Sequence, residues 1–157
     1  MRRALLLALC CAGCGAGTSL EGSLSEDVPL AFDQVQVQRT AGAIALVYLR
    51  AVPGGTGNDI VFKLTANTTG VALDGAAAID LAEKLGTGTR GQAERIVSGD
   101  GRSALPAISR GALHFSAAPA SGASASGSFN VLFAAGGSVG AGKTVFGDFS
   151  ATVQEVQ

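Results

Sequence analysis

The segment 128–153 alternates between apolar and polar residues, and this period of two constrains the fold more than any other feature of the chain. On one parity stand Phe129, Val131, Phe133, Val145, Gly147, Phe149, Ala151 and Val153. Because successive side chains of a strand point to opposite faces, the pattern predicts two strands, each with one buried face. The glycine-rich stretch 134–143 separates the two runs, so the segment is expected to form a β-hairpin.

Shorter runs of the same kind precede this hairpin. They are found in 28–39, 60–65, 92–98 and 111–116. The first of them changes parity near Asp33, which predicts a bulge or a turn there. The run 43–52 is apolar on both parities, which is typical of a central strand covered on both faces.

The segment 76–86 fits two descriptions. Its apolar residues fit a helical stripe, whereas Ala77, Ile79 and Leu81 also fit the alternation of a strand. The strands on either side favour a strand here. We therefore predict an all-β fold, an antiparallel β-sandwich of about seven or eight strands, with a small β-barrel as the alternative.

The composition agrees with a single β domain. Of the 157 residues, 23 are glycine, 47% are hydrophobic and 15% are charged, a balance that suits short strands joined by glycine turns. The formal net charge is −1 and the basic residues form no stripe, so nucleic acid is not expected as a partner. Tryptophan is absent and Tyr48 is the only tyrosine, which leaves few aromatic platforms for bases or sugars.

The N-terminus has the pattern of an export signal. Met1-Arg2-Arg3 gives a positive start, and the apolar run 4–12 follows it. This run is too short to span a bilayer, which takes about 20 residues. Small residues come next, as a cleavage region requires. We therefore expect residues 1–13 to be a signal peptide.

The end of this leader, Cys11-Ala12-Gly13-Cys14, resembles the lipobox of bacterial lipoproteins. The resemblance implies cleavage before Cys14, which would be diacylated and become the new first residue. The chain departs from the family at Cys11, where leucine is usual, and an ordinary secretory signal with incidental cysteines is the alternative. Gly15, where aspartate would retain the protein at the inner membrane, implies sorting to the outer membrane.

All three cysteines belong to this region, at Cys10, Cys11 and Cys14. Cleavage would leave one cysteine, itself lipidated, so no intrachain disulfide could form. Several acyl chains on one residue would hold the protein firmly at the membrane, since a single chain binds only marginally. Residues 14–26 are small, polar and unpatterned, so we expect a lipidated tether there and a β domain over 27–157.

Residues 137–144 match the phosphate-loop pattern G-x-x-x-x-G-K-[ST] letter for letter. That loop works only when a helix follows it, because the N-terminal amides of the helix hold the phosphates. Here the β-branched and aromatic residues and Gly147 of 145–153 disfavour a helix. We interpret the match as accidental, with Lys143 in solvent, and predict no nucleotide, cofactor or metal.

His114 is the only histidine, and its parity is opposite to that of Leu113 and Phe115. It is therefore predicted on the polar face of a strand. A metal site would need further ligands, and a serine triad would have His114 as its only base. No serine stands in a G-x-S-x-G motif with a strand–turn–helix context, so no enzymatic activity is predicted.

The remaining charged residues are read as structural. The scattered aspartates are Asp59, Asp74, Asp80, Asp100 and Asp148. Turn formation is the usual reason for such residues, and a calcium site built from loops is the alternative. The densest charged group is Glu94, Arg95, Arg102 and Arg110. We interpret that group as solvated strand edges that oppose edge-to-edge pairing.

Together these features predict an exported lipoprotein at the outer membrane, on its periplasmic or outer face. It would be a non-enzymatic structural or protein-interaction module whose protein partner the sequence does not name. A carrier of a small apolar ligand or an ion is one alternative and would need a cavity between the sheets. An extracytoplasmic hydrolase is another, and it would need His114 or a carboxylate pair inside a cleft.

Overall fold

Strands dominate the computed structural model, which describes residues 17–75 and 77–156. The elements are η1 (Ser23–Glu26), β1 (Gln34–Arg39), β2 (Ala43–Ala51), β3 (Asn58–Asn67), β4 (Ile79–Asp80), β5 (Lys84–Leu85), β6 (Gly88–Thr89), β7 (Gly91–Ile96), β8 (Ile108–Phe115), β9 (Ser124–Phe133) and β10 (Thr144–Glu155). The predicted all-β class is confirmed. Across these described ranges, no helix has the length and apolar character needed to cross a membrane.

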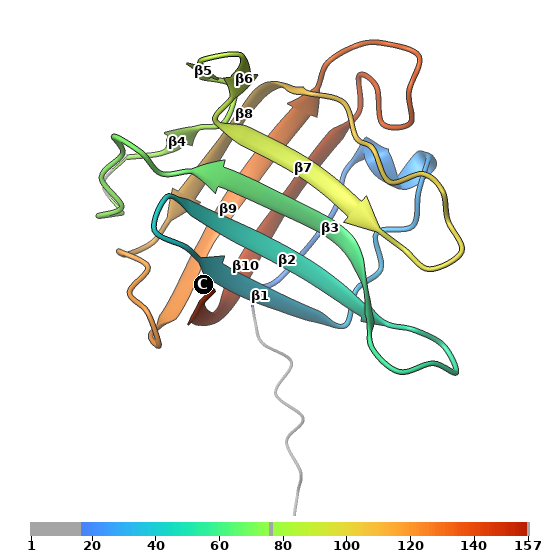
Figure 1. Cartoon of the computed structure of the whole chain (residues 1–157), viewed down its shortest axis with the longest axis horizontal. Helices are drawn as coiled ribbons and strands as arrows, with labels where there is room; N and C mark the ends of the chain where they lie inside the picture. Colours follow the sequence, from blue (N-terminus) through green and yellow to red (C-terminus); the bar gives the residue numbers. More distant parts are fainter. Residues whose placement is uncertain (1–16, 76, 157) are drawn as a thin grey trace, which may run out of the picture.

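Eight of these strands form one continuous sheet in the order β4-β8-β9-β10-β1-β2-β3-β7, and β5 and β6 form a separate ribbon. The strands pair antiparallel except for β1 with β10, which run parallel. The sheet folds over itself into two layers, with β1, β2, β3 and β7 in front of β8, β9 and β10 (Figure 1). The fold is therefore one nearly closed sheet, intermediate between the predicted sandwich and its barrel alternative.

Leu81 joins the two ends of this sheet. Its N–H donates to the Gly111 carbonyl of β8 (3.0 Å), and its carbonyl accepts the N–H of Gly91 of β7 (2.8 Å). A Cβ on Gly91 would lie 2.7 Å from the Leu81 Cβ, so only glycine allows this approach. The described part of 76–86 thus holds short strands and turns, as the strand interpretation expected.

The strand patterns that led the prediction are confirmed. The hairpin of β9 and β10 pairs Val131 with Val145, and β1, β2 and β3 form a meander. Every residue from Ile44 to Leu49 in β2 is buried, on both faces. On the outer face, Ala45, Val47 and Leu49 form a small buried cluster, and Ile60 of β3 packs against it.

Aromatic rings fill the space between the layers. The ring contacts are Phe32–Tyr48 at 4.9 Å, Phe62–Phe129 at 5.7 Å and Phe115–Phe149 at 5.3 Å between centroids. The Tyr48 hydroxyl donates to the backbone carbonyl of Asp148 (3.0 Å), which links β2 to β10 across the core. Burial, and to a smaller extent the charge of Asp148, raises the pKa of Tyr48 well above its usual value.

Replacing Tyr48 by phenylalanine should lower the free energy of unfolding by about 0.5–1.5 kcal/mol at neutral pH, because one buried hydrogen bond is lost. The folded protein raises the pKa of Tyr48 above its unfolded value of about 10. Wild type should therefore lose stability as the pH rises above about 10, and Y48F should lack that loss. Urea unfolding of both proteins at pH 7 and pH 11 checks this, and an identical pH dependence would contradict it.

Residues 19–26, expected to belong to the tether, pack on the sheet instead. Ser19 donates its N–H to the Asp148 carbonyl, and Glu21 exchanges two backbone hydrogen bonds with Phe146, all at 2.9 Å. Leu20 and Leu24 are buried in the core. The folded domain therefore begins near Ser19, ahead of the predicted boundary at residue 27.

Two glycines allow this docking. A Cβ on Gly147 would lie 2.3 Å from the carbonyl oxygen of Ser19, and a Cβ on Gly22 would lie 2.2 Å from that of Thr144. Gly22 also has a φ of 133°, which side chains rarely adopt. A larger residue at either position would push the N-terminal segment away from β10.

Gly147→Ala should therefore lower the free energy of unfolding by about 1–3 kcal/mol, the usual range for forcing extra atoms into a packed site. Gly137→Ala is the matched control, because a Cβ there meets nothing within 4 Å. Urea titration of the two variants and wild type measures the difference. Equal midpoints for G147A and wild type would show that the segment does not dock as described.

Candidate functional site

The phosphate-loop match lies in the turn between β9 and β10. Thr144 begins β10, so a strand stands where the motif requires a helix. The N–H of Gly140 donates to the Asp27 carboxylate (3.0 Å), and the Lys143 ammonium pairs with Glu26 (2.5 Å). Lys143, expected in solvent, is thus partnered, and its hydrogen bond to Glu26 raises its pKa. The carboxylates of Asp27 and Glu26 therefore already accept from the Gly140 N–H and the Lys143 ammonium, the donors that a phosphate would need.

A charged cluster lies at the end of β7. Arg95, expected at a solvated edge, is only 2% exposed, and it donates to the Asp100 carboxylate (2.8 Å) and the Arg102 carbonyl (2.9 Å). Arg102 donates to both carboxylate oxygens of Asp100 (2.8 and 2.9 Å) and to the Asp27 carbonyl (2.9 Å). The cluster binds the turn after β7 to the segment that follows η1, so its role is structural.

Hydrogen bonds from Arg102 and then from Arg95 hold the pKa of Asp100 far below its usual range. The stability that depends on this carboxylate is therefore present above the unfolded pKa, about 4, and is lost as the pH falls below it. Asp100→Asn leaves Arg95 buried against a neutral amide, so its urea midpoint at pH 7 should fall. Below pH 4, wild type should lose stability more steeply than D100N.

Glu21→Gln is a suitable control for that experiment, because Glu21 is exposed and pairs through its backbone. The urea midpoint of E21Q should stay close to that of wild type both at pH 7 and below pH 4. If D100N matched E21Q at pH 7, the cluster would not be the structural tie described above.

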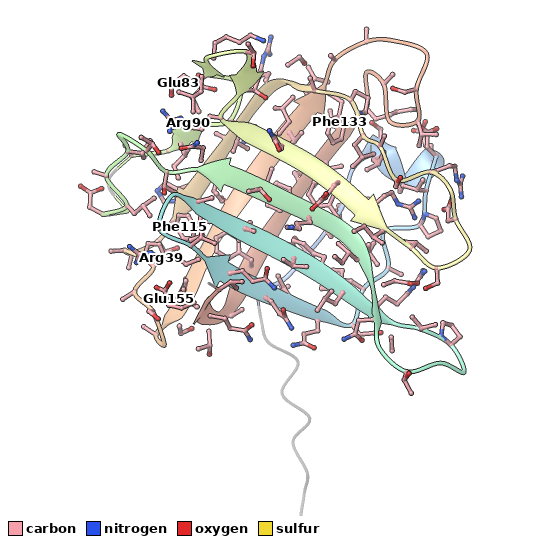
Figure 2. The ribbon with its side chains drawn as sticks, in the orientation of Figure 1. Arg39, Glu83, Arg90, Phe115, Phe133 and Glu155 are labelled. Carbon is pink, nitrogen blue, oxygen red and sulfur yellow. The ribbon has the colours of Figure 1, made fainter. Side chains whose placement is uncertain are left out.

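Two further charged side chains are buried: Arg90, which no sequence pattern indicated, and Asp59, which was predicted to form a turn. Arg90 lies beside Glu83 (Figure 2), with 2.7 Å between Nε and the carboxylate, and also donates to the carbonyls of Asn67 (2.8 Å) and Thr69 (3.1 Å). Asp59 is likewise buried and accepts from the Ser98 N–H (2.8 Å) and from Arg50 (3.1 Å). The Ser98 hydrogen bonds contribute most to lowering the pKa of Asp59. An isolated charge in a polar stretch gives no sequence signal of burial.

His114 lies on the exposed outer face of β8, as its parity predicted. The strand register places Ser128 of β9 between His114 and Asp148 of β10. A catalytic triad needs the imidazole in the middle, whereas here His114 and Asp148 are two strand spacings, about 10 Å, apart. The Asp148 carboxylate accepts the Ser19 hydroxyl instead (3.1 Å).

His114, Ser128 and Asp148 form part of a shallow polar depression of about 400 Å³ on this outer face. Its lining includes Gly17, His114, Ser116, Ser126, Ser128, Asp148 and Ser150. A second depression of about 360 Å³ on the same face is lined by Arg110, Leu132 and Phe146, among others. Phe146 is 47% exposed, which is unusual for a phenylalanine.

The other charged residues that the sequence grouped together do not lie together in a site. Glu94 pairs with Lys63 at 2.8 Å on the opposite layer, and Arg110 is exposed on β8. Among the residues that the structure describes, no three histidine, cysteine, aspartate or glutamate side chains could hold a metal ion together. The leader and Cys14 lie outside the described residues.

Neither edge of the large sheet offers a long open strand. At one edge, β4 has only two residues, Ile79 and Asp80, which pair with Leu113 and Ala112 of β8. On the other edge, Glu94 of β7 forms an isolated bridge with Ala104. Addition of a partner's strand is therefore hindered, and side-chain faces are the larger available surfaces.

Comparison with protein-family models, with curated proteins and with solved structures gave no match in any of the three.

Proposed function

We propose that the protein is an exported lipoprotein, held at the outer membrane by acylated Cys14, that acts as a non-enzymatic structural or protein-interaction module. The observation that carries this proposal is the leader ending in Cys11-Ala12-Gly13-Cys14, followed within a few residues by the folded domain. A lipid on Cys14 would need only a short connection to a domain that begins near Ser19.

The geometry of the domain supports a module that acts through its surface. The interior is filled by contacting rings such as Phe62 and Phe129, which disfavours a carrier with an apolar cavity between the layers. The order His114–Ser128–Asp148 on an open face disfavours a hydrolase of the triad type. The occupied donors of Gly140 and Lys143 disfavour nucleotide binding at the loop.

Metabolic labelling with a fatty-acid analogue in a bacterial host tests the anchor. Wild type should incorporate the label, and Cys14→Ser should lose essentially all of it, because the thioether and the new N-terminus both require this cysteine. Cys11→Ser is the matched control and should stay labelled. Label that persists on C14S would refute Cys14 as the anchor.

A further inference from the structure

We infer that the outer face of β8, β9 and β10 lies against the lipid headgroups, so that the layer of β1, β2, β3 and β7 points away from the membrane. This inference rests on the proposed acylation of Cys14. It adds an orientation to the anchor, and it makes the outward layer the surface available to a protein partner.

The connection between Cys14 and the folded domain is short. Ser19 is fixed to β10 by its backbone and side chain, and Gly17 lines the depression that contains His114 and Ser126. Three residue steps separate Cys14 from Gly17. A fully extended chain covers at most about 3.6 Å per step, so the acylated residue lies within about 11 Å of Gly17. The anchor therefore leaves the domain on the side of β8, β9 and β10.

The domain is thicker than this connection is long. Packed layers lie about 10 Å apart, and outward side chains bring the two outer surfaces to roughly 20 Å from each other. An anchor within about 11 Å of one surface is too short to bring the bilayer onto the other. The layer that carries Gln92 is therefore held away from the lipid.

The outer face of β8, β9 and β10 has a chemistry that suits lipid headgroups. Exposed hydroxyls cover it, from Ser116, Ser124, Ser126, Ser128, Ser150 and Thr152. Hydroxyl groups can donate to the phosphate and ester oxygens of lipid headgroups. Phe146, in the neighbouring depression, presents an exposed apolar ring that can enter the boundary between headgroups and acyl chains.

The charges of this face have both signs. Arg110 and Asp148 are exposed on β8 and β10, Glu21 is the bridge partner of the exposed Phe146, and Asp80 of β4 pairs with Ala112 of β8. Three carboxylates and one guanidinium therefore lie on this face, so the short anchor, and not attraction to anionic headgroups, holds the face at the bilayer. The opposite layer instead carries the Lys63–Glu94 ion pair.

Fluorescence quenching in vesicles tests the orientation. The acylated protein has no free thiol, so one engineered cysteine can carry a fluorophore. Ser126→Cys places it on the proposed membrane face, and Gln92→Cys, also exposed, places it on the opposite layer. In vesicles of phosphatidylethanolamine and phosphatidylglycerol with a headgroup quencher, quenching at residue 126 should be at least about twofold that at residue 92. Equal quenching, or stronger quenching at residue 92, would overturn the inference.

A spacer variant and mass spectrometry show whether the short anchor or the lipid affinity of the face causes the difference in quenching. A 20-residue Gly-Ser insertion after Gly15 lengthens the connection, so the twofold difference should shrink towards parity. A difference that survives the spacer would still support the orientation, since the face would then bind lipid by its own affinity. Absence of acyl groups on Cys14 by mass spectrometry would refute the proposed anchor and this inference with it. Acylated protein with equal quenching would refute the orientation alone.

Discussion

The contact on which the rest of the structure depends is the close backbone approach between residues 19–22 and the first half of β10. It exists because Gly22 and Gly147 have no side chains to keep the two backbones apart. Once the segment is docked, Leu24 enters the core and η1 brings Glu26 and Asp27 to the loop before β10. The start of the described domain is thereby fixed on the outer face of β8, β9 and β10.

Buried arginines have a recurring role in a domain whose described part has no disulfide. Arg90 donates to Glu83 and to the distant carbonyls of Asn67 and Thr69. Arg95 donates to the Asp100 carboxylate and to the Arg102 carbonyl in the turn after β7. A guanidinium suits this task because it presents several donors in a fixed plane. Replacing such groups by apolar residues can be neutral for stability, so their contribution here is to fix which loops meet.

The loop 137–144 illustrates the difference between a letter pattern and a binding site. A phosphate loop binds because its amides and lysine are unpaired and a helix dipole adds to them. In this protein a strand follows, and carboxylates from the N-terminal segment hold Gly140 and Lys143. The same donors that would attract an anion therefore stabilise the docked N-terminus. The two faces of the sheet differ in their chemistry: one is rich in hydroxyl groups and the other bears ion pairs.

The sequence by itself determined the all-β class, the terminal hairpin, the buried strand β2 and the exposure of His114. These depend on local alternation, and the parity of side chains along a strand is fixed by its backbone geometry. Only the tertiary structure decided the parallel pairing of β1 with β10, the closure at Leu81, the docking of residues 19–26 and the burial of Arg95. Each of these joins positions that are distant in the chain or depends on a partner's shape, such as the missing Cβ of Gly147. Periodicity carries no information about such contacts, because it describes which face a residue occupies and not what covers that face.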